Sequence, residues 1–180
     1  MSNFKPNLPQ DNAKIVVMST NNKELVNRVE ELGVKVLPSE NLSKLLTFEQ
    51  CHTDLQFLHY NKDTVFVLKE CTSLKENLKK YFPNVIEISK NIYKDYPNNV
   101  MLNCVVLNDK LICNTKTIAD EVLQMAIKNN LKIINANQGY TKCSTCIVNE
   151  NAIITSDKSI YKSCRNEMDV LLIRQGYIEL

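Results

Sequence analysis

Three stretches of the sequence align without gaps: LHYNKDTVFVLKE (Leu58–Glu70), CVVLNDKLICNTK (Cys104–Lys116) and CIVNENAIITSDK (Cys146–Lys158). In each stretch an apolar run is followed by a polar turn rich in Asn and Asp, and then by a second apolar or β-branched run. Two such runs around a short polar turn are typical of a β-hairpin. The sequence therefore predicts three related hairpins and an internally repeated fold.

The segments that follow the hairpins are also related. After each hairpin, apolar residues recur at the spacing of a helix, and a short apolar or β-branched run comes next. This spacing predicts a helix and then a strand after every hairpin. The N-terminal segment has the same strand–helix–strand pattern. The predicted helices are 23–32, 75–82, 118–128 and 167–174, and the predicted strands are 14–20, 34–40, 85–90, 131–137 and 177–180.

Together these segments predict an α/β protein built from about four strand–helix–strand units. A unit of this size cannot bury its apolar faces alone, so each must stack on its neighbours. We therefore expect an α/β propeller with its units around a pseudo-symmetry axis, as an incomplete ring whose last unit lacks a hairpin. The alternative is an ordinary α/β sandwich in which the similarity is coincidental. The length of 180 residues fits one domain over 1–180, with 1–12 as a flexible tail.

Charge and hydropathy argue against two classes of partner. The formal net charge is +2, with acidic and basic residues mixed along the chain, so we expect no nucleic-acid binding. The longest apolar runs, VFVL and VLLI, are too short to span a membrane.

The start, MSNFKPNLPQDN, has no apolar segment of a secretory signal, so we expect a cytoplasmic protein. Three glycines cannot build a phosphate-binding loop, and we expect no organic cofactor.

The seven cysteines are many for a chain of this length. An odd number of cysteines, without a secretory signal, argues against a complete disulfide framework. Most of them lie in apolar runs, where cysteine packs as a small hydrophobic residue. We expect Cys71, Cys104 and Cys113 to be buried and structural.

The segment before the first hairpin, FEQCHTDLQF (Phe48–Phe57), contains a His-x-Asp motif. In an extended strand, His52 and Asp54 would point to the same face. A histidine beside a carboxylate can act as a base, and a carboxylate can bind a cationic substrate. The alternative is a chance combination of His and Asp in a surface loop.

Two cysteines three residues apart precede and open the third hairpin, in NQGYTKCSTCIV (Asn137–Val148). If the units surround an axis, the starts of all hairpins converge near it, and Cys143 and Cys146 come close to His52 and Asp54. Cysteine near histidine and a carboxylate is an arrangement that produces a reactive thiolate. The alternation of side chains along a strand favours Cys146, so both cysteines are candidates for the nucleophile.

The C-x-x-C spacing has two other interpretations. A structural zinc site needs four ligands, and the chain has no second C-x-x-C, so Cys51, His52 or Cys164 would have to complete it. A thioredoxin-like redox motif opens a helix, whereas the residues after Cys146 predict a strand, a turn and a second strand. We expect no metal.

The repeated strand–helix pattern, CHTDLQF and GYTKCST resemble the pentein fold of enzymes that modify guanidino groups. That group includes arginine and agmatine deiminases, dimethylarginine hydrolases and amidinotransferases. From about Asp11 onward the chain resembles, more closely, an uncharacterised bacterial family placed with this fold, through HTDLQF, YPNNVMLNCVVLNDKLICN and NQGYTKCSTCIVNENAIITSD.

The resemblance implies a role for each matching residue. His52 matches the general base and acid, Asp54 the carboxylate that binds the guanidinium, and Cys143 the nucleophile that forms a covalent amidino adduct. A hydrolase or deiminase adds water to that adduct, whereas a transferase passes it to an amine. We expect Asn98, Asn99 and Gly139 to join Asp54 in binding a small guanidino-type substrate. Glu49 and Asp95 are candidates for a second carboxylate that binds the guanidinium.

A non-catalytic function remains the alternative. The pentein group also contains anti-association translation initiation factors, which bind the large ribosomal subunit and have no cysteine–histidine site. An incomplete ring would suit a protein that binds a partner through its surface. It would also suit a homodimer that completes the ring with a second chain.

Overall fold

The computed structural model describes residues 8, 11–107 and 109–176 as a mixed α/β protein with four small sheets. Three sheets have three strands each, and the fourth has two. The strands are β1 (Ile15–Met18), β2 (Lys35–Pro38), β3 (Phe57–His59), β4 (Thr64–Leu68), β5 (Asn84–Ile88), β6 (Val105–Val106), β7 (Lys110–Cys113), β8 (Lys132–Asn135), β9 (Thr145–Asn149), β10 (Ala152–Thr155) and β11 (Asp169–Leu172). The helices are α1 (Lys23–Glu31), α2 (Thr53–Gln56), α3 (Thr72–Leu78), α4 (Asp120–Lys128) and α5 (Lys158–Cys164).

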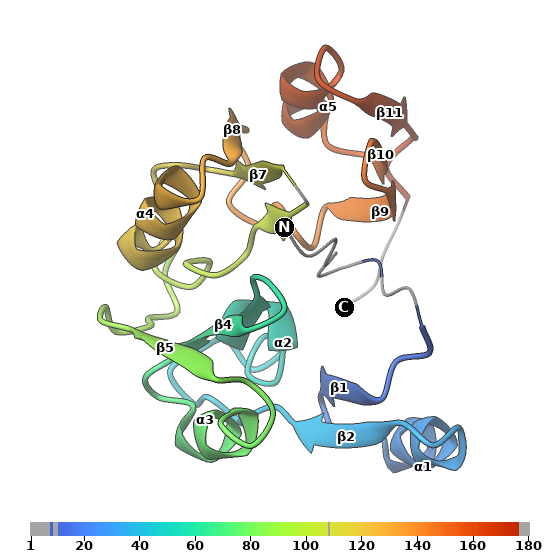
Figure 1. The fold of residues 1–180 in the computed structure, drawn as a ribbon, viewed down its shortest axis with the longest axis vertical. Helices are drawn as coiled ribbons and strands as arrows, with labels where there is room; N and C mark the ends of the chain where they lie inside the picture. Colours follow the sequence, from blue (N-terminus) through green and yellow to red (C-terminus); the bar gives the residue numbers. More distant parts are fainter. Residues whose placement is uncertain (1–7, 9–10, 108, 177–180) are drawn as a thin grey trace.

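The three larger sheets share one topology. In each, the central strand pairs antiparallel with the strand before it, as a hairpin, and parallel with the strand after it. A helix connects the two parallel strands, as a parallel crossover requires. The central strands β4, β7 and β10 occupy equivalent positions in the sequence alignment, so the three predicted hairpins are confirmed. Figure 1 shows the four sheets following one another in an arc, with α1, α3, α4 and α5 outside it and α2 inside.

The smallest sheet contains the predicted N-terminal strand–helix–strand segment. β1 and β2 pair in parallel, with α1 between them. Asn22 caps α1 by accepting a hydrogen bond from the backbone N–H of Leu25 at 3.0 Å, which satisfies one of the free donors of the first turn. No residue of α1 is buried, and its Leu32 is 81% exposed just after the helix. This unit is therefore the least packed part of the described fold.

The helix predicted at 167–174 is wrong. The structure places α5 earlier, and the middle of this segment forms β11. Asp157 starts α5 by accepting hydrogen bonds from the N–H groups of Ser159 and Ile160, at 2.7 and 2.9 Å. The apolar run of β11 pairs in register with β10, and a run this short has no periodicity that separates a strand from a helix. The strand predicted at 177–180 lies outside the described residues, as does most of the predicted tail.

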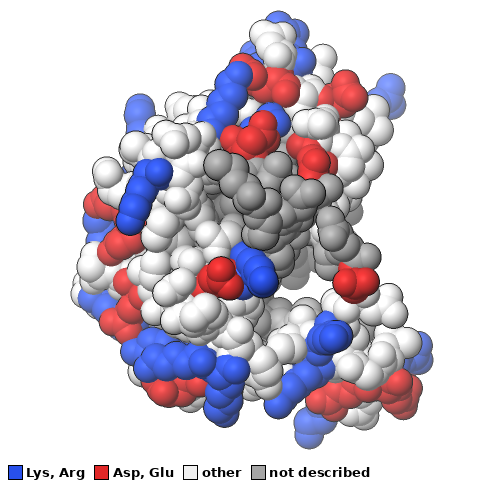
Figure 2. All heavy atoms as spheres, viewed as in Figure 1, with Lys and Arg blue, Asp and Glu red and all other residues white. Residues whose placement is uncertain are grey.

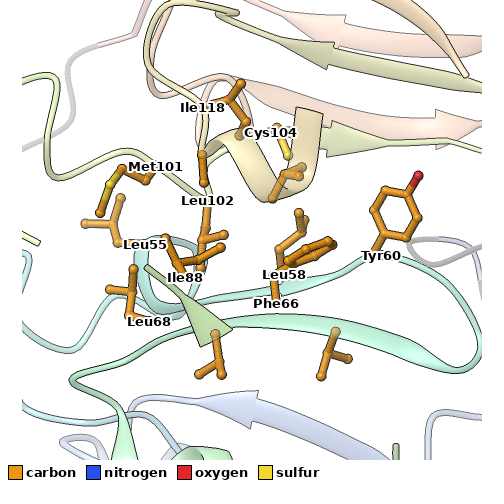
Figure 3. Close-up of a cluster of buried hydrophobic side chains, with 14 of the residues drawn as sticks. Leu55, Leu58, Tyr60, Phe66, Leu68, Ile88, Met101, Leu102, Cys104 and Ile118 are labelled. Atoms are coloured by element: carbon orange, nitrogen blue, oxygen red, sulfur yellow. The ribbon is translucent and has the colours of Figure 1, made fainter. Parts of the chain in front are cut away.

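The hairpin of β6 and β7 lies between two apolar clusters. Val106 and Leu111 point into the larger cluster, whereas Val105 and Ile112 point into the smaller one, because successive side chains of a strand face opposite sides. In the larger cluster, side chains around β3 and β4 meet those of the segment before β6, as Figure 3 shows. These include Leu55, Leu58, Phe66, Met101, Leu102 and Cys104.

The surface and the helices fit the mixed charge of the sequence. On the face shown in Figure 2, Lys and Arg are interspersed with Asp and Glu among the described residues. Exposed ion pairs such as Arg28–Glu24 join the two signs, and pairs of this kind contribute little to stability. No helix in the described part of the chain is both long and apolar enough to cross a membrane.

The expected burial of Cys71, Cys104 and Cys113 is confirmed, and Cys164 is buried as well. Burial is the main cause that raises the pKa of each thiol, because an apolar surrounding disfavours the thiolate. The pKa rises to about 12 for Cys71 and Cys113, to about 11 for Cys164, and well above its ordinary value for Cys104.

We expect the protein to lose stability between about pH 9 and pH 11. In this range the four thiols ionise in the unfolded chain but stay protonated in the folded chain, so stability present below their ordinary pKa is lost as the pH rises. Each thiol lowers the free energy of unfolding by up to about 1.4 kcal/mol per pH unit in this range. Guanidinium chloride unfolding followed by circular dichroism at pH 8 and pH 10.5 measures this loss. Cys113→Ala should reduce the difference between the two pH values, and an equal difference in this variant would contradict the prediction.

Candidate active site

The His-x-Asp motif lies at the start of a short helix. His52 is the N-cap residue of α2, with φ −68° and ψ 116°, and Asp54 lies in the first turn. The extended conformation predicted for this motif is therefore wrong. The side chain of Gln56 closes the turn instead: its Nε2 donates to the carbonyls of Glu40 and Gln50, at 2.7 and 2.8 Å. These buried hydrogen bonds of Gln56 hold the segment in a helical turn, although a short polar segment of this kind could also be extended.

Apolar neighbours fix the positions of the polar residues at the site. Leu55 is 1% exposed and directly follows Asp54, and Leu102 is 1% exposed and directly precedes Asn103. Figure 3 shows both leucines in the larger apolar cluster. Because both leucines are buried in this cluster, the adjacent residues Asp54 and Asn103 lie at its edge.

The cysteine loop is a compact turn before β9. The N–H of Ser144 donates to the carbonyl of Tyr140 at 3.0 Å, and the hydroxyl of Thr145 donates to the carbonyl of Thr141 at 2.8 Å. Cys143 lies in this turn, whereas Cys146 lies in β9 opposite Ile154. The C-x-x-C motif thus leads into a strand, unlike a thioredoxin-like motif.

Asn103, which is 1% exposed, connects the two loops. Its Nδ2 donates to Asp54 Oδ2 at 3.0 Å and to Cys143 Sγ at 3.1 Å. Its Oδ1 accepts from the N–H groups of Lys142 at 2.7 Å and Cys143 at 3.3 Å. The sulfur of Cys143 also donates to Asp54 Oδ2. A thiol and a carboxylate that lie 89 residues apart in the chain are therefore in direct contact.

The thiol of Cys143 holds its proton strongly. The side chain of Cys143 is exposed, but partial burial of its sulfur and the adjacent carboxylate of Asp54 raise its pKa to about 12, and the amide of Asn103 opposes this rise. Lys142, which precedes it, has a pKa lowered mainly by burial, while Asp54 and the nearby thiols act in the opposite direction. A neutral thiol beside a carboxylate is therefore the resting state of the site.

A buried carboxylate lies in the same region. Glu49 is 5% exposed and accepts from the hydroxyl of Tyr140 at 2.8 Å and from Nδ2 of Asn99 at 3.3 Å. Burial and the hydrogen bond to Glu49 raise the pKa of Tyr140 to about 12, so this phenol is a donor at neutral pH. Oδ1 of Asn99 is buried and has no hydrogen-bond partner within the described residues.

Gly139 allows the loop to pass close to Tyr96 and Val100. A Cβ atom at position 139 would lie 2.5 Å from Cε2 of Tyr96 and 3.0 Å from Cγ2 of Val100. The ring of Tyr96 stacks on that of Tyr140, with their centres 6.3 Å apart. Gly139 is thus required by packing at the point where the cysteine loop begins.

The structure does not bring all the candidates together. Asp54 and Cys143 are in contact, but His52 is exposed and makes no hydrogen bond to either within the described part of the chain. Asn98 and Asp95 are exposed, and Asn98 contacts Asp95 through its backbone N–H. Among the described residues, no group of three or more His, Cys, Asp or Glu side chains could hold a metal ion.

Sequence reasoning missed Asn103. The only signal was a polar residue directly before the apolar run CVVL, where the other two hairpins have Phe57 and Thr145. Such a residue is also common in a turn, so the pattern alone does not indicate a functional position.

The chain belongs to a family of unknown function, DUF6873, whose model matches residues 16–180. This agrees with the predicted membership of an uncharacterised family. No functionally curated protein matches the sequence.

Among solved structures, the chain is similar to three enzymes. The N-terminal domain of ArgZ, an arginine dihydrolase from the ornithine–ammonia cycle in cyanobacteria, is 13% identical with a TM-score of 0.44, over 67% of this chain and 43% of that chain. The agmatine deiminase of C. jejuni is 12% identical with a TM-score of 0.48, over 89% and 61%. The inosamine-phosphate amidinotransferase StrB1 from Streptomyces griseus is 12% identical with a TM-score of 0.45, over 92% and 44%.

Agmatine deiminases and amidinotransferases are among the enzymes that the sequence resemblance names. This chain spans between 43% and 61% of the lengths of the three solved chains.

We expect Asp54→Asn to lower the pKa of Cys143, because the change removes the negative charge beside the thiol. Alkylation by neutral iodoacetamide at pH 8 should then become about tenfold faster for each pKa unit lost. Peptide mapping of alkylated Cys143 over time measures the rate. Asp95→Asn removes an exposed carboxylate outside the site and should leave the rate unchanged. Equal rates in Asp54→Asn and the unmodified protein would contradict the raised pKa.

Gly139→Ala should lower the free energy of unfolding by about 1 to 3 kcal/mol, because the added methyl group forces Tyr96 and Val100 to move. Gly176→Ala is the matched control, since a Cβ atom there meets no atom within 4 Å. Chemical unfolding of both variants, followed by circular dichroism, tests the prediction. It fails if the two variants are equally stable.

Proposed function

We propose that this protein is an enzyme that acts on a carbon–nitrogen bond of a small guanidino-type molecule through a covalent adduct on Cys143. The observation that carries this proposal is the contact between the thiol of Cys143 and the carboxylate of Asp54, both hydrogen-bonded to the amide of Asn103. A carboxylate beside a sulfur nucleophile can hold the cationic substrate while the sulfur attacks its central carbon.

The reaction that we propose has two stages. Cys143 loses its proton, its sulfur bonds to the guanidinium carbon, and a carbon–nitrogen bond breaks as the departing nitrogen takes up a proton. The product of this stage is a thiouronium adduct. In the second stage water adds to the same carbon, the carbon–sulfur bond breaks, and the thiol recovers a proton. If an amine replaces water, the same adduct supports a transfer reaction.

The substrate itself would activate the nucleophile. In the resting site the negative charge of Asp54 helps to hold the proton on Cys143. A guanidinium bound at Asp54 would neutralise that charge and add a positive charge near the sulfur, and both effects favour the thiolate. Cys143 would therefore react faster when a cation is bound and only slowly with neutral electrophiles.

His52 is the proposed general base and acid. It lies two residues before Asp54 and is exposed at the N-cap of α2, where its side chain caps no N–H group of the helix. A histidine side chain can take up and release a proton during a reaction. Cys146 is the weaker candidate for the nucleophile, because Asp54 contacts Cys143.

The shared topology of the three larger sheets supports the proposed architecture. We interpret these sheets and the β1–β2 sheet as four units of an incomplete α/β propeller, whose hairpins bring their first strands toward the site. We also propose that the protein works in the cytoplasm, where its buried and exposed thiols would stay reduced.

The test compares a cationic probe with a neutral probe of the same shape, 2-chloroacetamidine and 2-chloroacetamide. Each alkylates a thiolate through its carbon–chlorine bond, with loss of chloride. After correction for the reactivity of glutathione, the cationic probe should label Cys143 at least about tenfold faster than the neutral one at pH 8. Intact mass and peptide digestion identify the labelled cysteine.

Two variants define the result further. Asp54→Asn should remove the preference for the cationic probe, and His52→Ala should greatly slow labelling by that probe. Slow labelling spread over several cysteines, without a preference for Cys143, would overturn the proposal. The protein would then be examined as a non-catalytic binding protein.

A further inference from the structure

The four hydrogen bonds of the Asn103 side chain use its whole capacity. An amide oxygen has two lone pairs, and here they accept from two consecutive N–H groups of the cysteine loop. An amide NH₂ has two hydrogens, and here they point to the carboxylate of Asp54 and the sulfur of Cys143. The side chain is 1% exposed, so these four bonds are made within the protein.

This pattern also determines the orientation of the amide. Rotation by 180° would place the NH₂ group against two backbone N–H donors and the oxygen against a carboxylate. Both contacts would be repulsive, and the buried groups would lose their hydrogen-bond partners. Asn103 therefore presents donors, and only donors, to the carboxylate and the sulfur.

We propose that Asn103 is the positioning residue of this site: its amide holds the carboxylate of Asp54 and the sulfur of Cys143 side by side, and it stabilises the sulfur once the proton has left. This inference rests on the proposed function, because it assigns a role in the ionisation of the proposed nucleophile. It is nevertheless a statement about the free protein, and it can be tested without any substrate.

The groups around the sulfur explain why a donor is needed. The negative charge of Asp54 disfavours the thiolate. Tyr140 is a neutral phenol whose hydroxyl donates a hydrogen bond to Glu49. Lys142 is the nearby cation, and burial lowers its pKa. The N–H of Asn103 is a donor with no charge to lose, so it supports the thiolate at every pH at which the protein is folded.

The experiment exchanges the two side chains that meet at this point. Asn103→Asp keeps the oxygen that accepts from the cysteine loop, but it removes both donors and adds a second carboxylate. The double variant Asp54→Asn with Asn103→Asp places the amide and the carboxylate in each other's positions. Every donor then has an acceptor again, and a single negative charge lies beside the sulfur.

The measurement is the rate at which neutral 2-chloroacetamide alkylates Cys143, from pH 7 to pH 11. We expect Asn103→Asp to slow this alkylation at pH 9 by about tenfold or more, and the exchange variant to return to within about threefold of the unmodified protein. Asn114→Asp is the matched control. Asn114 is also a buried asparagine with an oxygen that accepts a backbone N–H, but it does not contact Cys143.

Two outcomes would overturn the inference. The pH profile of Cys143 alkylation could be the same in folded Asn103→Asp as in the unmodified protein, or the exchange variant could fail to fold. If Asn103→Asp itself does not fold, the exchange variant decides alone, since it preserves the pairing. Because the probe is neutral, a failure here is distinct from a failure of the guanidino-directed reaction, which the cationic probe tests.

Discussion

Two acidic groups in contact cannot both lose their protons without a large electrostatic cost, and this constraint governs the site. The carboxylate of Asp54 and the thiol of Cys143 share one proton between them. The raised pKa of Cys143 favours the protonated thiol. Under the proposed function, a bound cation would lower this pKa, so the reactivity of the sulfur would depend on the charge of the ligand.

The apolar core makes this contact possible. The hairpin of β6 and β7 is buried on both faces and separates the two apolar clusters. Leu55 and Leu102 insert into the larger cluster, and the polar residues next to them meet at its edge. Much of the energy that holds Asp54 and Asn103 in place therefore comes from burial of their apolar neighbours, because a single hydrogen bond contributes a net of only about 1 kcal/mol.

Glu49 shows that a carboxylate near the site need not be a ligand. Tyr140 and Asn99 already donate to it, and it is buried. Its hydrogen bonds join the segment before α2 to the cysteine loop, since Tyr140 lies in that loop and Glu49 lies in that segment. Gly139 allows the close approach of Tyr96, which stacks on Tyr140. These contacts give the loop a second attachment besides Asn103.

The sequence by itself determined the three hairpins, since polar turns between apolar runs have few other conformations. Its residue types selected His52, Asp54, Cys143 and Cys146 as candidates, and the resemblance to the pentein fold pointed to Cys143 as the nucleophile. It could not determine the conformation of 52–56 or 167–174, because short segments take the conformation that their tertiary contacts favour. Only the tertiary structure decided that Cys143, rather than Cys146, meets Asp54, and that Asn103 joins them. Those relations depend on side chains far apart in the chain, and a local pattern carries no information about which of them share a buried hydrogen bond.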